Sequence, residues 1–215
     1  MIEYVCPVEE SLYEEVLNHL RHTFFHEEPL NASVGLCSRP GEGHERLEAV
    51  CLDTLRDGLS VAALENGCRV VGAALNGSQT RQQLLQAVHE LETEPDEKFR
   101  HIFTLLYGAN HRLDLFTKYG VERLFECRIL SVAPECRGRG VARALLERSE
   151  QEARARGFTL FKEDATGLVS QRLARRQGMH LEAEVVYSEH LGDDGEPIFN
   201  PPDPHTSLQV MAKLL

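Results

Sequence analysis

The sequence predicts a single α/β domain in which helices surround one sheet. The chain has 215 residues, long enough for one substantial core. Apolar residues make up 42% and charged residues 27% of it, the balance of an ordinary globular protein. Segments with helical and strand periodicity alternate from end to end, without a linker or an internal repeat. We therefore expect one domain over residues 1–215.

The first half is predicted to hold two amphipathic helices and one hairpin. In order, these elements are a helix at 9–22, a helix at 45–56, and strands at 60–64 and 69–75. In the first helix, apolar side chains recur at steps of four. Pro29 lies beyond its end and biases the residue before it away from helical dihedrals. Between the two strands, Asn66-Gly67 supplies the positive φ angles that tight hairpins require.

The second half is predicted to alternate helices with strands. In order, these are helical segments over 81–118 with a break near 94–96, a strand at 124–132, a helix at 139–156, a strand at 158–162, a helix at 168–177, and strands at 180–188 and 206–213. The helix at 139–156 has the strongest pattern, with Val141, Leu145 and Ala153 along one side and Gly157 at its end. The apolar run before Pro134 suits a central strand.

Charge and composition exclude several classes of function. The formal net charge of −11 argues against binding to a phosphate backbone and is compatible with a cationic partner such as an amine. No segment approaches the roughly 18 apolar residues of a membrane span, and the N-terminus does not resemble a secretory signal. The six cysteines are scattered singly. We therefore expect a cytoplasmic protein with reduced thiols, no bound metal, and no membrane or nucleic-acid partner.

The segment from Arg137 to Ala142 has the features of an anion-binding turn. It follows an apolar strand and opens a helix, whose first N–H groups carry a partial positive charge. Gly138 and Gly140 let a phosphate approach the backbone, while Arg137 and Arg139 add positive charge. The alternative is a helix-capping loop with its arginines in solvent. Neither a dinucleotide GxGxxG motif nor a P-loop is present.

The pattern Arg137-x-x-Gly140-x-Ala142 after an apolar strand resembles the acetyl-CoA motif of the GNAT superfamily. This resemblance implies the GNAT acetyltransferase fold, a mixed and mostly antiparallel central sheet flanked by helices. It also implies acetyl-CoA as cosubstrate, with a strand end that splays from its neighbour and pairs with the pantetheine arm. A main-chain N–H there would polarise the thioester carbonyl. The implied coenzyme-binding residues are Leu130, Ser131, Val132, Arg137, Gly138, Arg139, Gly140, Val141 and Ala142.

Two further segments resemble insect-type arylalkylamine N-acetyltransferases, the group that includes dopamine N-acetyltransferases. They are Phe24-Phe25-His26-Glu27-Glu28-Pro29-Leu30-Asn31, and Pro204-His205 followed by Gln209-Val210-Met211-Ala212-Lys213. The resemblance spans nearly the whole chain, and its weakest matches are the loops at 38–46 and 80–96.

In that family the glutamate before Pro-Leu is the proposed general base, which implies Glu28 here. An ammonium group must lose a proton before its nitrogen attacks a thioester, and burial raises a carboxylate's pKa toward that task. Glu27 is then placed to attract the ammonium, while Phe24 and Pro29 contact the amine. The alternative is that both glutamates are solvated loop acids.

The family also places two hydroxyl groups four residues apart after the fifth strand, and the matching residues are Thr166 and Ser170. On one helix face they would relay protons to the base and to the departing thiolate. This chain departs from the family pattern by having a threonine at the first position and Glu163-Asp164-Ala165 before it. Helix capping by Thr166 is the competing interpretation.

His205 is expected to line the amine pocket, although a structural role is as compatible with the sequence. Cys127 and Cys136 have no evident histidine partner, so we expect direct transfer in a ternary complex and no acetyl-enzyme. The expected substrate is a small arylalkylamine such as dopamine, tyramine, serotonin or tryptamine. The alternatives are acetylation of an aliphatic or guanidino amine (agmatine, polyamine), a protein or peptide N-acetyltransferase, or a non-catalytic acetyl-CoA sensor. We expect a monomer.

Overall fold

A seven-stranded mixed sheet forms the centre of the molecule. The computed structural model describes residues 1–215. The strand order is β1-β2-β3-β4-β5-β7-β6, and only β4 and β5 are parallel neighbours. The strands are β1 (Ile2–Val5), β2 (Val61–Glu65), β3 (Arg69–Thr80), β4 (Arg123–Val132), β5 (Leu160–Ala165), β6 (His180–Val186) and β7 (Ser207–Leu214). The predicted mixed, mostly antiparallel sheet is therefore confirmed.

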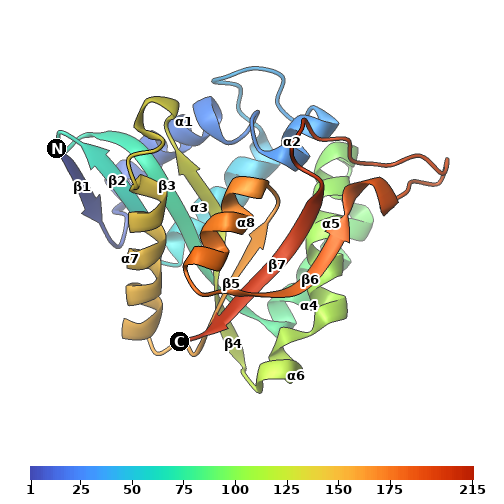
Figure 1. Ribbon diagram of the computed structural model, residues 1–215. Coiled ribbons are helices and arrows are strands. Elements are labelled where there is room, and N and C mark those ends of the chain that lie inside the picture. The colour runs from blue at the N-terminus through green and yellow to red at the C-terminus, as the bar shows by residue number, and fades with distance from the viewer.

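Helices cover both faces of this sheet (Figure 1). The helices are α1 (Tyr13–Thr23), α2 (Pro29–Val34), α3 (Glu45–Arg56), α4 (Arg81–Glu90), α5 (Glu97–Leu113), α6 (Leu115–Tyr119), α7 (Val141–Ala155) and α8 (Leu168–Arg176), with short 3-10 turns η1 (Glu10–Leu12), η2 (Leu91–Thr93), η3 (Pro134–Cys136) and η4 (Tyr187–Glu189). In Figure 1, α7 and α8 lie in front of the sheet, and α1, α3, α4 and α5 lie on the far side. None of these helices has the length and apolarity needed to cross a membrane.

Two apolar cores result, one on each face, because alternate residues of a strand point to opposite sides. In β5, Leu160 packs in the core beneath α1, α3 and α5, whereas Phe161 and Ala165 pack in the core beneath α7 and α8. Every residue of β5 therefore has a defined side. This alternation matters below, because the next residues of the strand are charged.

The hairpin of β2 and β3 forms as the sequence predicts. Asn66 and Gly67 adopt φ angles of 54° and 75°, the left-handed values of a tight turn. The strands pair antiparallel on either side of the turn. Strand β3 continues to Thr80, five residues beyond the predicted end, because its polar second half pairs with β4.

Several predicted boundaries are wrong. The strand at 158–162 lies instead at Leu160–Ala165, because the two residues after Gly157 lead into the sheet before pairing begins. The helix at 139–156 begins at Val141, since Gly140 takes a left-handed φ of 82° and caps it. Strand β1 and helix α2, with four and six residues, are too short to show a period and were not predicted.

Candidate active site

The site is built around a gap between β4 and β5. These strands pair only from Phe125 to Cys127 on one side and from Phe161 to Glu163 on the other. Beyond this point β4 runs on to Val132 without a partner on that edge. A β-bulge contributes to the divergence, since Arg128 is an extra residue of β4 between two residues paired with β3. The expected separation of the strand end is therefore present.

The free edge of β4 offers unpaired backbone groups to the gap. Ala133 donates its N–H to Val71 of β3, and successive residues of a strand direct these groups to opposite edges. Leu130 and Val132 therefore direct theirs toward β5. The carbonyl of Val132 accepts a hydrogen bond from Arg137 Nε at 3.0 Å. The backbone of Leu130 is left as the edge that a pantetheine arm would pair with. Ser131 directs its backbone groups toward β3, and its hydroxyl is bonded to Thr23 at 2.8 Å, so neither is free for the coenzyme.

The turn at the start of α7 has the form of an anion cradle. Gly138 and Gly140 adopt φ angles of 73° and 82°, and a Cβ at either residue would meet no atom within 4 Å. The space beside both glycines is therefore open. No acidic side chain lies in the first turn of α7, whose N–H groups remain free for a ligand. These features fit a pyrophosphate.

A single large cavity joins this turn to the gap. It has a volume of about 1290 Å³, and its lining includes Leu130, Gly140 and Glu28. This volume exceeds that of most small-molecule sites and has room for a coenzyme arm together with a small amine. The cavity reaches both faces of the sheet, since Glu163 lines it on the α7–α8 side and Asp164 on the opposite side.

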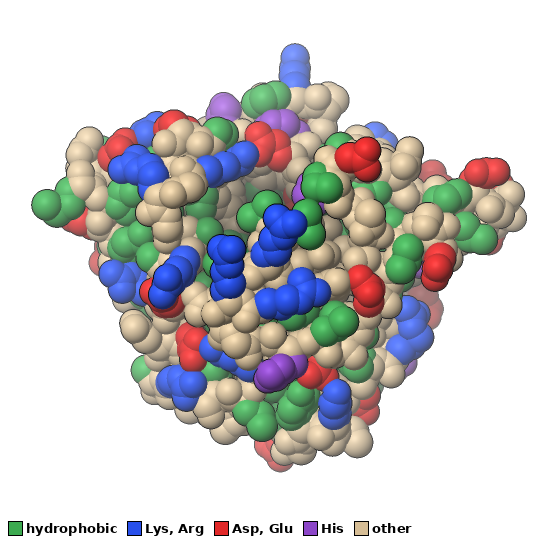
Figure 2. All heavy atoms as spheres, in the orientation of Figure 1, with side chains coloured by type: hydrophobic (Ala, Val, Ile, Leu, Met, Phe, Trp, Pro, Cys, Tyr) green, Lys and Arg blue, Asp and Glu red, His purple; other side chains and the backbone are tan.

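The mouth of the cavity between α7 and α8 is basic. Figure 2 shows Lys and Arg side chains gathered around a hollow on this face. Of the five arginines that line the cavity, Arg128 bonds to Glu126 and Thr54, and the other four belong to α7, α8 and the turn before α7: Arg137, Arg143, Arg172 and Arg176. The two on α8 are one helical turn apart, so they share a face. Sequence reasoning missed this pair, although their spacing in the predicted helix was visible.

Glu28 is partly buried in the cavity wall, and one of its carboxyl oxygens is fully buried, which argues against the solvated-acid alternative for this residue. Its Oε2 accepts a hydrogen bond from Asn31 N at 2.8 Å and caps α2, with Pro29 in the first turn. Its Oε1 is buried without a partner. Burial raises the pKa of Glu28, while the Thr166 hydroxyl and the N–H groups of Asn31 and Leu30 partly oppose the rise. One oxygen thus caps a helix and the other is unused by the protein.

Thr166 and Ser170 are not placed on one helix face as expected. Helix α8 begins at Leu168 with Gly167 as its N-cap, so Thr166 precedes the helix and does not cap it. Both residues nevertheless line the cavity. The Ser170 hydroxyl donates to the carbonyl of Gly167 at 2.8 Å and stabilises the first turn of α8. The carbonyl of Thr166 is held by the hydroxyl of Tyr187 at 2.7 Å.

His205 lies beside the start of α8 and lines the same cavity. Its Nδ1 accepts the N–H of Leu168 at 3.2 Å, which leaves Nε2 as the protonated nitrogen of the neutral ring. A Cβ on Gly167 would lie 3.1 Å from His205 Nδ1 and 3.3 Å from Pro29 Cγ. Only glycine therefore allows α2, α8 and His205 to approach this closely.

Glu27 points toward the coenzyme turn. It forms an ion pair with Arg137 at 2.6 Å, and both side chains are partly exposed. Its charge is therefore already balanced, in contrast to the expected free attractor of an ammonium ion. The pair joins the segment before α2 to the turn before α7.

Aromatic side chains line the part of the cavity near α5. Phe24, Phe103 and Tyr107 belong to this lining, and the last two rings lie 5.3 Å apart between centroids. The pattern of the sequence does not indicate that the two α5 rings join the site, because both also fit the apolar stripe of a helix.

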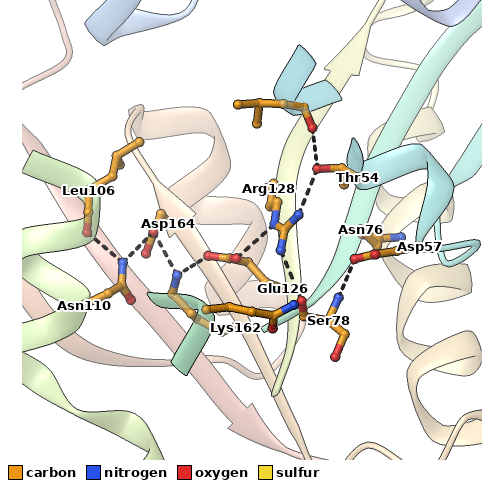
Figure 3. A network of polar contacts seen from close by, with 12 residues as sticks. Thr54, Asp57, Asn76, Ser78, Leu106, Asn110, Glu126, Arg128, Lys162 and Asp164 are labelled. Carbon is orange, nitrogen blue, oxygen red and sulfur yellow. Dashed lines mark hydrogen bonds and ion pairs between the residues drawn. The ribbon is translucent and has the colours of Figure 1, made fainter. Parts of the chain in front are cut away.

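A buried polar network forms the floor of this part of the cavity (Figure 3). Lys162, only 1% exposed, is bonded to Glu126 and lies 2.8 Å from Asp164, which accepts from Asn110 at 2.7 Å. Arg128 bonds to Glu126 and, at 2.9 Å, to the hydroxyl of Thr54. Burial alone would raise the pKa of Glu126, but the two cations outweigh it and lower the pKa. The sequence feature that indicates this network is the charged run Lys162-Glu163-Asp164 in an otherwise apolar strand.

Cys127, buried near the turn, does not have the surroundings of a nucleophile. Burial and the nearby Glu163 raise the pKa of the Cys127 thiol well above its usual value. Its Sγ donates only to the carbonyl of Ile129, at 3.7 Å. A thiol of this kind stays protonated and unreactive.

Comparison with known proteins places this geometry in a family. Residues 36–179 match the acetyltransferase (GNAT) family. The chain belongs to the GNAT family. Enzymes of this family use acetyl-CoA as cosubstrate, and the open strand edge and the glycine turn are where this member has room for it.

Solved structures narrow the comparison. The crystal structure of arylalkylamine N-acetyltransferase 2 from Aedes aegypti is 41% identical, with a TM-score of 0.95 over 99% of this chain and 98% of that one. A polyamine N-acetyltransferase of Drosophila melanogaster that forms N-acetylagmatine is 26% identical, with a TM-score of 0.89 over the full length of both chains. An agmatine N-acetyltransferase is 27% identical, also with a TM-score of 0.89, over 100% of this chain and 99% of that one. The resemblance to insect-type arylalkylamine N-acetyltransferases is confirmed, and this GNAT protein is an N-acetyltransferase by family.

Proposed function

We propose that this GNAT protein transfers the acetyl group of acetyl-CoA to the primary amine of a small arylalkylamine such as tyramine, dopamine, serotonin or tryptamine. The transfer is direct, in a ternary complex. The observation that carries the proposal is the buried and unpartnered Oε1 of Glu28 in the wall of a cavity that also contains the free edge of β4. A base and a coenzyme edge in one cavity are the two parts that acetyl transfer to an amine requires.

Each part has a defined task. The amine arrives as an ammonium ion, and Glu28 removes a proton so that the nitrogen lone pair can attack the thioester carbon. An N–H on the free edge of β4 stabilises the oxyanion that forms. The turn from Arg137 to Ala142 holds the pyrophosphate and so sets the depth to which the thioester enters the gap.

Aromatic walls support an aryl acceptor. Phe24, Phe103 and Tyr107 offer ring faces and edges for stacking, which partly offsets a composition of only 7% aromatic residues. The similarity to an arylalkylamine N-acetyltransferase favours the same class.

An aliphatic or guanidino amine is the second candidate. Asp164 has one buried oxygen, Oδ1, without a partner, and it lies on the floor of the cavity near the aromatic wall. A second cation of agmatine or a polyamine would be attracted to this carboxylate. Two of the similar structures are enzymes acting on such amines.

Thiol release from acetyl-CoA tests the two candidates with one panel of amines. We expect kcat/KM for tyramine and tryptamine to exceed that for agmatine and spermidine by about fivefold or more, since a buried aromatic contact contributes about 1 kcal/mol. Preference for agmatine would favour the second candidate. Binding of acetyl-CoA without turnover of any amine would indicate a sensor in place of an enzyme.

A further inference from the structure

Glu163 is a carboxyl group in the same cavity with no role in the structure. It is 4% exposed, it makes no hydrogen bond to the protein, and its Oε2 is buried without a partner. A buried side chain of this polarity is normally paired, so an isolated one needs an explanation.

Its position is the closed end of the gap. Glu163 and Cys127 are the last paired residues of β5 and β4 before the two strands part. Glu163 alternates with Phe161 and Ala165, so it faces the α7–α8 side, where the basic mouth and the anion cradle lie. A pantetheine arm that follows the free edge of β4 inward from the cradle ends at this residue.

Its neighbours distinguish it from the other carboxyls of the cavity. Glu126 and Asp164 lie on the opposite face and share Lys162 as a counter-ion. The residues beside Glu163 in the adjacent strands are Cys127 of β4 and Met211 of β7, and neither supplies a positive charge.

The group therefore holds a proton at neutral pH. Burial raises the pKa of Glu163 to about 8, and the negative charge of Asp164 adds to the rise. None of the arginines that line the cavity is among the groups that shift it; these are Arg128, Arg137, Arg143, Arg172 and Arg176. Its O–H has no acceptor within the protein.

We propose that Glu163 is the general acid that protonates the sulfur of coenzyme A as it leaves. The proposal rests on the proposed acetyl transfer and adds the residue that completes it. A thiolate is a poor leaving group in a dry site unless a proton reaches it. Thr166 and Ser170, the hydroxyls expected to serve this step, lie farther along the chain past the end of β5.

The protons balance in this scheme. Of the three ammonium protons, two leave through Glu28 to solvent, one before and one after the C–N bond forms. The C–S bond then breaks, its electron pair remains on sulfur, and the sulfur takes the proton of Glu163. Glu163 regains a proton from water, so each cycle forms one thiol and one amide and releases one proton.

The variant Glu163→Gln tests the proposal. Glutamine keeps the shape of the side chain and can donate a hydrogen bond, but its amide does not act as an acid. In the wild type, kcat measured with saturating substrates should fall as the pH rises through about 8, where Glu163 ionises. In the variant, kcat should be about 10²-fold lower near neutral pH and should no longer fall on the alkaline side. The acidic limb, which belongs to Glu28, should remain, and the calorimetric Kd of acetyl-CoA should stay within about threefold.

Glu92→Gln removes an exposed acid far from the cavity and serves as the matched control, with the wild-type profile expected. A structural role of Glu163 would change KM and leave the alkaline limb in place, and that result would overturn the proposal. A wild type whose kcat stays level above pH 8 would overturn it too, even if the variant did not fold. A wild type that turns over no amine would instead contradict the proposed function.

Discussion

Glu28 combines two roles in one carboxylate. Oε2 caps α2 through Asn31, and this bond fixes the rotamer that leaves Oε1 facing the cavity. The cap therefore orients the proposed base. A helix cap contributes about 1 kcal/mol, so a variant that removes the whole side chain would change stability and chemistry together.

The variant Glu28→Gln separates the two effects because its amide oxygen still accepts from Asn31. We expect kcat to fall about 10²-fold or more near pH 7, with little change in the Kd of acetyl-CoA, since the amide does not accept the ammonium proton. The control is Asp96→Asn, which alters the equivalent cap of α5, where Asp96 accepts from Phe99 at 2.9 Å. An equal loss of kcat in both variants would mean that capping, and not base catalysis, explains the effect.

Glu163 should also affect the pH dependence of folding. Its folded-state pKa of about 8 lies above the ordinary value of 4.5, so the folded state keeps a proton that the unfolded state has lost. The resulting cost is absent below pH 4.5, grows up to pH 8 and is constant above it. Glu163→Gln should therefore raise the free energy of unfolding by on the order of 3 kcal/mol at pH 8 and leave it unchanged near pH 4.5. Thermal unfolding at both pH values checks this, and equal shifts at both would contradict it.

At the scale of elements, α7 and the turn before it form the proposed site of the coenzyme's pyrophosphate. Gly140 and Gly157 stand at opposite ends of this helix, with φ angles of 82° and 72° and open space beside each. They carry the same backbone strain on substitution but differ in what should occupy the space.

Gly140→Val should weaken acetyl-CoA binding at least about tenfold, because the side chain would fill the place of a phosphate at the helix N-terminus. Gly157→Val is the matched control, with a similar loss of stability and normal coenzyme binding. Calorimetric titration of both variants measures the difference. Equal Kd values would show that the turn does not hold the coenzyme.

The predictability of these elements follows from their length and pattern. Helix α7 and the β2–β3 hairpin carry strong local signals, and both form. Helix α2 has only six residues, fewer than two turns, so its existence depends on the Glu28 cap and on the left-handed Gly35 at its end. Helix α8 begins at Leu168, as its pattern predicts, so Thr166, which the resemblance placed on a helix face, lies before the helix. Gly167 between them packs closely against His205 and Pro29.

At the scale of the whole molecule, the site joins residues far apart in sequence. Glu28, Thr166 and His205 line one cavity. From the sequence, each could be assigned to a common site only through the resemblance to a family. The arginines of α8 and the rings of α5 were beyond local reasoning, because their inclusion depends on how the sheet orders β4, β5 and β7.

The distribution of charge is uneven in a way that the net value conceals. The formal net charge is −11, yet arginines gather at one mouth of the cavity (Figure 2). We expect the double variant Arg172→Gln/Arg176→Gln to raise KM for acetyl-CoA about tenfold at low salt and to leave KM for the amine unchanged, because it removes positive charge only from the coenzyme's entrance.

The effect should shrink as salt is added, since counter-ions screen exposed charges. The double variant Arg154→Gln/Arg156→Gln removes two arginines at the C-terminal end of α7, where they are paired with Glu150 and Glu152. It should behave as the wild type. A similar rise in KM for both double variants would show that net charge, and not its position, governs coenzyme capture.

The parting of β4 from β5 leaves a passage that opens on both sides of the sheet. A donor and an acceptor can therefore enter from opposite faces of the sheet and be bound at the same time. Such an arrangement removes any need to store the acetyl group on the protein between two visits. The inert Cys127 at the base of the passage, buried and protonated, is consistent with a one-step exchange.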